Sequence, residues 1–183
     1  MFRTLSHYFF ITLFSLSLLA AGTVTGRIVG VTDGDTVKIL TADKHEIKVR
    51  LYGIDAPESA QDFGQVAKKF TSDIAFGKEA SVEIIDSDRY GREVGIVRTG
   101  EGSSVNEQLV AAGLAWRYPQ YCKLEPLCTD LGRLEQEART AKRGLWADPA
   151  PVAPWQWRKD QKYKQDERLK TLEKSRQYHH SVR

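Results

Sequence analysis

Residues 33–58 read DGDTVKILTADKHEIKVRLYGIDAPE, and this stretch decides the fold that the sequence predicts. Apolar and polar residues alternate over Thr36 to Leu40 and again over Glu46 to Ile54, which is typical of half-buried β-strands. The polar segment Thr41 to His45 separates the two runs and predicts a hairpin loop. The two strands therefore form a hairpin whose outer ends lie side by side.

The flanking segments complete a small barrel with helices. Three more strands and three helices are predicted from apolar residues at strand or helix spacing. Five strands with a helix between the third and the fourth is the OB-fold arrangement. The expected fold class is therefore α+β and β-rich: a five-stranded OB-fold barrel with three α-helices. The further strands are predicted at Thr23–Val31, Ala80–Ile85 and Val94–Arg98, the helices at Gln65–Phe76, Val105–Ala112 and Asp130–Arg143, and an extended segment at Leu114–Tyr118.

The composition is that of an ordinary globular protein and excludes a collagen-like, wholly disordered or polytopic membrane chain. The 183 residues are 41% hydrophobic and 28% charged, which suits one domain with appendages. The net charge of +3 conceals a division along the chain. Residues 23–157 hold 17 Lys and Arg against 20 Asp and Glu, whereas residues 158–183 hold 9 against 4. Only the C-terminal part is therefore typical of a polyanion-binding segment.

The first 22 residues have the pattern of a secretory signal peptide. Arg3 supplies a positive charge, Phe9 to Leu19 is mostly apolar, and small residues follow at positions 20–22. The apolar run is shorter than the about 20 residues of a membrane span. The expected location is secreted or periplasmic, with membrane contact only during export. An uncleaved N-terminal anchor is the alternative.

Two cysteines, Cys122 and Cys128, lie close together between Tyr121 and Thr129. In an oxidising compartment, a close pair of this kind predicts one disulfide. A metal-binding pair is the weaker alternative, because none of the four histidines is nearby. The histidines also lie away from the acidic residues described next, which argues against a His-based catalytic triad.

Three acidic side chains, Asp35, Asp55 and Glu58, gather near one end of the predicted hairpin. Carboxylates without His or Cys suit a hard cation with oxygen ligands, so Ca²⁺ or Mg²⁺ fits this set and Zn²⁺ does not. The alternative is that Asp33 and Asp35 are ordinary turn residues. Taken alone, the turn interpretation is the stronger of the two.

Two arginines favour a functional site. Arg50 lies on the strand that leads to Asp55, and Arg92 follows Tyr90 and Gly91 in a predicted turn. A guanidinium is a rigid fork that matches phosphate oxygens, so two such forks facing a bound cation would clamp a phosphodiester. A surface ion pair is the alternative for each arginine.

These residues lie in three blocks that resemble, in order and spacing, the signature blocks of the staphylococcal nuclease (thermonuclease) family. The blocks are residues 33–37 (DGDTV), 50–58 (RLYGIDAPE) and 88–92 (DRYGR). Residues 106–115 and 144–146 are similar to segments of the family's later helices. The resemblance covers Val24 to Trp146, and three linked blocks are far more specific than any one of them.

The resemblance implies a calcium site. In this family the positions of Asp35 and Asp55 bind Ca²⁺, and the position of Ala56 lends a backbone carbonyl. Family members often carry Thr at that last position, so Ala56 keeps the carbonyl but lacks the hydroxyl.

The resemblance also implies the catalytic residues. The position of Glu58 acts through water, as a general base or as the group that orients the attacking water. The positions of Arg50 and Arg92 bind the phosphate and stabilise the transition state. Tyr90 matches a position near the bound nucleotide. Apart from the resemblance, Tyr118 is a candidate for stacking on a base, since aromatic side chains bind single strands in this way.

The expected protein is a secreted, Ca²⁺-dependent, sugar-nonspecific nuclease that hydrolyses DNA and RNA, prefers single strands and leaves 3′-phosphates. A monomer without a stable protein partner is expected. The expected organisation is a signal peptide over 1–22, a nuclease domain over 23–157 and a charged basic tail over 158–183, helical or disordered. A non-catalytic OB-fold module that binds single-stranded nucleic acid is the alternative function.

Overall fold

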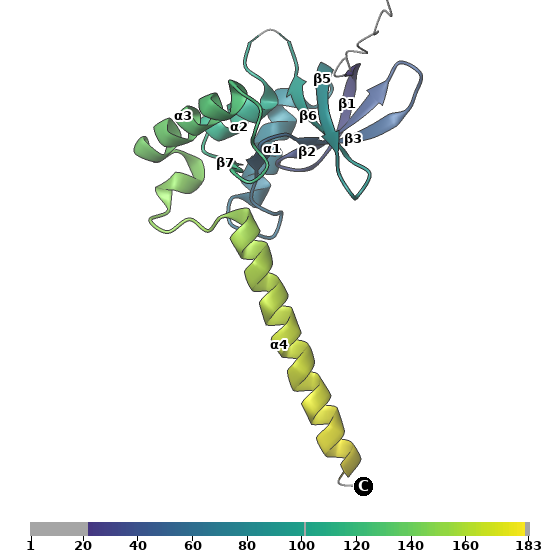
Figure 1. Ribbon diagram of the computed structural model, residues 1–183, viewed down its shortest axis with the longest axis vertical. Helices are drawn as coiled ribbons and strands as arrows, with labels where there is room; N and C mark the ends of the chain where they lie inside the picture. Colours follow the sequence, from purple (N-terminus) through teal and green to yellow (C-terminus); the bar gives the residue numbers. More distant parts are fainter. Residues whose placement is uncertain (1–21, 101, 182–183) are drawn as a thin grey trace, which may run out of the picture.

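The computed structural model describes residues 22–100 and 102–181, so positions 1–21 of the predicted signal peptide lie outside the described residues. Five strands close into a barrel, helices pack against one side of it, and a long helix projects from its lower end (Figure 1). Around the barrel the strands follow the order β1 (Thr23–Asp33), β2 (Thr36–Thr41), β3 (Glu46–Leu51), β6 (Glu93–Arg98) and β5 (Glu79–Ser87).

The barrel closes because β1 pairs with two neighbours and β3 pairs with β6. β1 runs antiparallel to both β2 and β5, and its register with β2 shifts at two bulges. The pairing of β3 with β6 is parallel. The inward residues Val37, Ile39 and Val49 are fully buried, as their alternation with polar neighbours predicts. The predicted fold class, an α+β OB-type barrel, is confirmed.

The third strand is shorter than predicted, because the chain leaves the barrel at Gly53. This residue has φ 75°, a left-handed conformation that Gly adopts readily. β3 therefore ends at Leu51, and the next two residues after Gly53 form β4 (Ile54–Asp55). β4 pairs antiparallel with β7 (Trp116–Arg117) in a separate small sheet.

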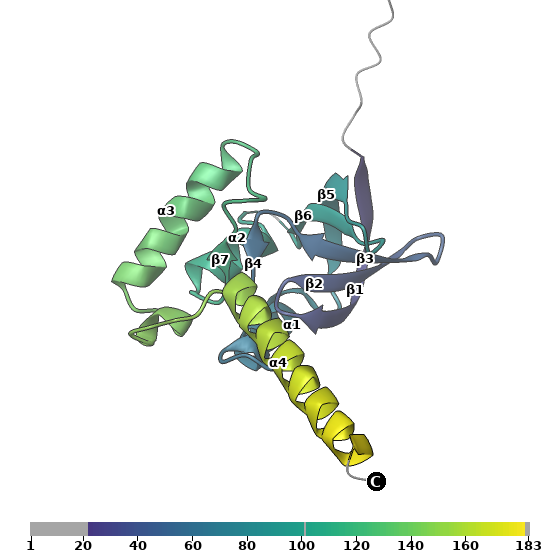
Figure 2. The same ribbon diagram turned by 60° about the horizontal axis from the view of Figure 1, so that its bottom comes forward.

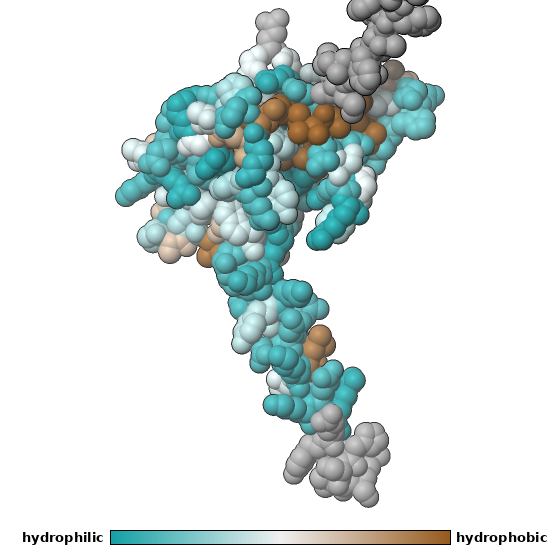
Figure 3. All heavy atoms as spheres, viewed as in Figure 1, coloured by the Kyte–Doolittle hydropathy of each residue, from teal (hydrophilic) through white to brown (hydrophobic). Residues whose placement is uncertain are grey.

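The described chain has four α-helices, one more than predicted. The additional helix, α4, continues far from the barrel (Figures 1 and 2), and the coloured part of it seen in Figure 3 is mostly hydrophilic. The predicted domain boundary at 157/158 falls inside this helix. None of the helices in residues 22–100 and 102–181 is long and apolar enough to cross a membrane. The helices are α1 (Gly64–Ala75), α2 (Val105–Ala111), α3 (Leu127–Thr140), the 3₁₀ helix η1 (Gly144–Ala147) and α4 (Pro154–Ser181).

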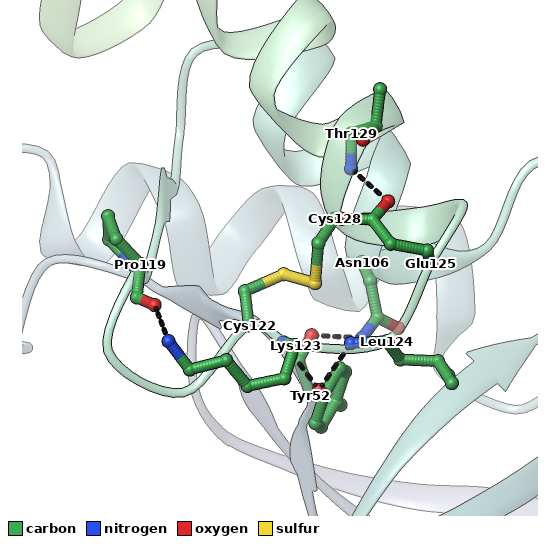
Figure 4. Close-up of a disulfide and its surroundings, with 9 residues drawn as sticks. All are labelled: Tyr52, Asn106, Pro119, Cys122, Lys123, Leu124, Glu125, Cys128 and Thr129. Atoms are coloured by element: carbon green, nitrogen blue, oxygen red, sulfur yellow. Dashed lines mark hydrogen bonds between the residues drawn. A yellow bond between two sulfur atoms is a disulfide. The ribbon is translucent and has the colours of Figure 1, made fainter.

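A buried amide and a disulfide tie the helices to the barrel. Asn106 on α2 accepts a hydrogen bond from the Val97 backbone at 3.1 Å and donates to the carbonyls of Tyr52 at 2.9 Å and Gly95 at 3.3 Å. The hydroxyl of Tyr52 accepts hydrogen bonds from two backbone N–H groups between the cysteines. Figure 4 shows that segment, closed by the disulfide Cys122–Cys128. The turn that leads from β3 to β4 is thereby held on two sides.

We expect Asn106→Ala to lower the free energy of unfolding by about 2–4 kcal/mol, because it leaves buried polar backbone groups without partners. Gln108→Ala on the same helix is the matched control, since Gln108 is half-buried and its side chain donates an exposed hydrogen bond to the Ser103 carbonyl. Urea unfolding followed by tryptophan fluorescence measures both variants. If Asn106→Ala lowers the free energy of unfolding no more than the control does, the buried amide does not tie α2 to the barrel.

Candidate active site

Asp35, Arg50 and Asp55 meet where β2, β3 and β4 come together. Asp35 precedes β2, Arg50 is the penultimate residue of β3, and Asp55 ends β4. The Leu51 N–H donates to the Asp35 carbonyl at 2.8 Å, which fixes the end of β3 beside the start of β2. The hairpin thus brings the arginine and the second aspartate back to the first, as the sequence predicts.

The turn that carries Asp35 packs tightly against α1. Thr71 on that helix is fully buried and donates to the Gly34 carbonyl at 2.6 Å. A Cβ added to Gly34 would lie 2.8 Å from the Cβ atoms of both Ala56 and Ala67, so only Gly fits there. The Ala56 N–H donates to Asp35 Oδ2 at 2.6 Å. Close backbone packing therefore holds the Asp35 carboxylate against the residue that follows Asp55.

Arg50 bridges the two aspartates with its fork. Its Nη1 lies 3.0 Å from Asp35 Oδ2, and its Nη2 donates to Asp55 Oδ1 at 2.7 Å. Nη1 also donates to the carbonyls of Leu51 at 3.2 Å and Ile54 at 3.0 Å. These contacts fix the plane of the guanidinium, which is the geometry that lets arginine bind two anions at once.

Both aspartates are buried, and burial sets their protonation. Asp35 is 6% exposed and Asp55 is 1% exposed. Burial raises the pKa of Asp35 to about 7; Arg50 opposes this rise, and the charges of Asp33 and Asp55 add to it. Burial also raises the pKa of Asp55, against the lowering effect of Arg158 and Arg50. The two carboxylates therefore favour any additional positive charge placed between them.

Arg158, from the first turns of α4, is a second guanidinium in the cluster. Its Nη2 donates to Asp55 Oδ2 at 2.8 Å, and its Nη1 donates to Glu58 Oε1 at 2.7 Å and to Asp55 Oδ1 at 3.3 Å. Although burial opposes it, the hydrogen bonds to Asp55 and Glu58 raise the pKa of this guanidinium. Glu58, the predicted general base, is thus joined to Asp55 through a residue of the C-terminal helix.

Arg92 lies in a different set of contacts. Its Nε donates to Asp88 Oδ2 at 2.6 Å, and its guanidinium lies 5.7 Å from the centre of the Tyr90 ring. Although desolvation opposes it, the hydrogen bonds from Arg92 hold the pKa of Asp88 below its ordinary value. Tyr90 is 69% exposed. Among the described residues, no ion pair joins Arg92 to Asp35, Asp55 or Glu58. In the described structure, Arg50 therefore contacts the carboxylate cluster, whereas Arg92 pairs with Asp88 instead.

An aromatic group borders the cluster at the root of α4. The Tyr118 ring stacks on Trp155 with an interplanar angle of 6° and a centroid distance of 5.0 Å. Trp155 also meets Trp116 edge to face at 5.7 Å. Burial and the nearby charge of Asp55 raise the pKa of the Tyr118 hydroxyl. Tyr118 therefore lies beside the carboxylates, but one of its faces is covered by Trp155.

The donor chemistry at this place fits a hard cation. Asp35 and Asp55 offer carboxylate oxygens, and the buried Oδ1 of neighbouring Asp33 has no hydrogen-bond partner. Both cysteines are in the disulfide, and His45 lies beside Asp43 in the loop between β2 and β3. Within residues 22–100 and 102–181, no three His, Cys, Asp or Glu side chains form a group arranged to hold a metal ion. A metal would therefore rely on two carboxylates with backbone or water oxygens.

Sequence reasoning missed Arg158, because it placed position 158 in a tail outside the folded domain. The preceding residues Pro154 to Trp157 carried a signal, since two tryptophans beside a proline are typical of packed chain. No local pattern indicated which acidic residues Arg158 would meet.

Comparisons with known proteins agree with the fold. Residues 48–148 match the family model described as staphylococcal nuclease homologue. An uncharacterized endonuclease of Escherichia coli is 42% identical over 146 residues, which cover 80% of this chain and 92% of the relative. A micrococcal nuclease of Shigella flexneri is 38% identical over 145 residues, which cover 75% and 82% respectively.

The barrel, the carboxylate–arginine cluster and these matches together define a nuclease, a hydrolase of phosphodiester bonds. The chain belongs to the staphylococcal nuclease family.

We expect Asp35 to make the metal-free protein less stable as the pH rises. The folded state retains the Asp35 proton up to about pH 7, whereas the unfolded state loses it near the ordinary value of 3.8. This contribution to stability is complete below about pH 4 and is lost as the pH rises through about 7.

Asp35→Asn removes that titration, so above pH 7 and with a chelator present it should be more stable than wild type by about 1–4 kcal/mol. Urea unfolding at several pH values measures the difference, and Asp62→Asn, at an exposed position, is the control. If the stability–pH curves of wild type and Asp35→Asn are parallel, the pKa of Asp35 is not raised in the folded protein.

Proposed function

We propose that this protein is an exported, Ca²⁺-dependent, sugar-nonspecific nuclease that cleaves DNA and RNA and leaves 3′-phosphates. The single observation that carries the proposal is the Arg50 fork between Asp35 and Asp55, with Glu58 joined to the same cluster. Phosphodiester hydrolysis gathers negative charge on oxygens that are already negative, so it needs fixed positive charge and an activated water. The cluster holds groups for both tasks.

Each residue has a role that follows from its chemistry. The Glu58 carboxylate accepts a proton from the attacking water or orients that water. The guanidinium of Arg50 donates hydrogen bonds to the phosphate oxygens on which charge develops. Arg92 reaches the same phosphate by exchanging its Asp88 partner for the substrate. Tyr90 and Tyr118 contact the nucleotide that carries the phosphate.

Asp35 and Asp55, with the carbonyl of Ala56, would hold the calcium ion. When bound, Ca²⁺ supplies positive charge next to the phosphate and coordinates water. Three protein ligands leave part of a shell of 6–8 oxygens for water and substrate. Ca²⁺ also suits an exported protein, because weak sites are filled outside the cell.

The substrate is flexible nucleic acid, and single strands or frayed duplex are preferred. The folded part has more acidic than basic residues, as the counts for residues 23–157 show, which disfavours tight non-specific binding to a duplex. A monomer is sufficient for this chemistry, because the proposed groups all come from one chain.

Export is supported by two features of the chain. Residues 1–22 have the charge, apolar run and small residues of a signal peptide. The Cys122–Cys128 disulfide is the kind of bond that persists in an oxidising compartment. N-terminal sequencing of protein recovered from the periplasm or medium should give a start near Thr23, and an intact Met1 in membrane fractions would support the anchor instead.

We expect purified protein to cleave fluorescent single-stranded DNA and RNA with Ca²⁺ and to lose this activity with a Ca²⁺ chelator. Glu58→Gln should lower the rate constant by roughly 10²–10⁴, because the proton acceptor is lost. Glu83→Gln, at an exposed position of β5, is the matched control and should keep wild-type activity. Phosphatase sensitivity of end-labelled products identifies the 3′-phosphate.

Tight binding of single strands without any turnover under Ca²⁺ would contradict the nuclease and favour a nucleic-acid-binding module. Cleavage that is equal in wild type and Glu58→Gln would keep the nuclease but remove Glu58 from its mechanism.

A further inference from the structure

The position of Arg158 conflicts with a metal ion on Asp55. Asp55 Oδ2 accepts a hydrogen bond from Arg158 Nη2 at 2.8 Å, and Oδ1 accepts from Arg50 at 2.7 Å and from Arg158 at 3.3 Å. Both oxygens of this carboxylate are therefore engaged by guanidinium groups. Three guanidinium hydrogen bonds leave about one of the roughly four lone-pair sites of this carboxylate, so a cation that binds Asp55 through more than that site must displace one of these groups.

Arg158 is the group that can leave. The Arg50 side chain is 15% exposed and donates to two carbonyls as well as two carboxylates. The Arg158 side chain is 40% exposed and comes from a helix that extends into solvent. Its solvent access lets the Arg158 guanidinium leave without breaking contacts to the backbone, but its hydrogen bonds to Asp55 and Glu58 must be broken when a divalent ion takes its place. Displacing Arg50 would break a buried network.

The root of α4 has its own anchor, independent of the ion pairs. Trp155 stacks on Tyr118, and Gln61 donates to the Val152 carbonyl at 2.7 Å just before the helix begins. The guanidinium can therefore leave the carboxylates by rotating its long side chain, while the helix stays in place.

We propose that Arg158 is a tethered cation that competes with Ca²⁺ for Asp55 and Glu58. In the metal-free protein it neutralises these carboxylates and donates a hydrogen bond to Oε1 of Glu58. Ca²⁺ binding requires its displacement, so Arg158 sets the calcium concentration at which the site opens. This inference rests on the proposed calcium-dependent function and assigns a role to a residue of the C-terminal helix.

Isothermal titration calorimetry of the purified full chain with CaCl₂ alone tests the competition. Arg158→Gln should bind Ca²⁺ about 10–100-fold more tightly than wild type, because hydrogen bonds between charged groups no longer have to be broken. Arg158→Lys keeps the charge but loses the two-pronged fork, so it should bind more tightly than wild type and less tightly than Arg158→Gln. Arg168→Gln removes an exposed arginine from the same helix and should keep wild-type affinity.

Two results would overturn the proposal while leaving the nuclease intact: wild-type affinity in Arg158→Gln, or wild-type affinity in Arg158→Lys with tighter binding in Arg158→Gln alone. The second result would mean that Arg158 acts only as a distant charge. If no variant binds Ca²⁺, both the competition and the calcium dependence of the proposed function are wrong. Circular dichroism of each variant confirms that it is folded before titration.

Discussion

The burial of the Arg50 guanidinium between Asp35 and Asp55 is the interaction on which the rest of the site depends. Two carboxylates that are 6% and 1% exposed repel each other, and neither could stay ionised there without a shared cation. For Arg50 to contact both carboxylates, the three backbone segments that carry these residues must converge. Two glycines make this convergence possible. Gly34 allows the first aspartate to approach Ala56, and Gly53 turns the second out of the barrel.

The same electrostatics explain how an acidic domain can act on a polyanion. The cluster gathers Asp33, Asp35, Asp55 and Glu58 around two guanidinium groups, so it lacks positive charge. In the proposed function, a divalent cation would offset that deficit and favour the binding of phosphate. Metal binding and substrate binding therefore depend on the same thing, which is additional positive charge at the cluster. The tethered guanidinium of Arg158 supplies part of that charge when no metal is bound.

Much of the fold and the centre of the site could be predicted because the relevant signals are local. Strand alternation in residues 36–54 indicates the hairpin, which brings Arg50 beside Asp35, and the few residues from Arg50 to Asp55 keep the second aspartate near them. The break after Leu51 was missed, since the apolar residues continue to Ile54 while the backbone turns at Gly53. Alternation of apolar and polar residues indicates which side chains face the core. It does not indicate where the chain passes from one sheet to another, because the alternation continues across the break.

The contribution of α4 was beyond such reasoning. The helix lacks an apolar stripe, so its sequence resembles a solvated tail, and tertiary contacts at its first turns anchor it. Arg158 meets Asp55 across 103 positions of chain, a contact that no spacing rule indicates. Arg92 shows the reverse case: its motif is recognisable, yet its guanidinium turns to Asp88.

A crystal structure of the protein grown with Ca²⁺ tests the central claim most directly, namely that the Asp35–Arg50–Asp55 cluster is the metal centre of a nuclease. The expected result is an ion about 2.3–2.6 Å from oxygens of both aspartates, with Arg50 still bridging them and Arg158 withdrawn from Asp55. An ion bound elsewhere, or saturating Ca²⁺ with Asp55 still closed by Arg158, would contradict it.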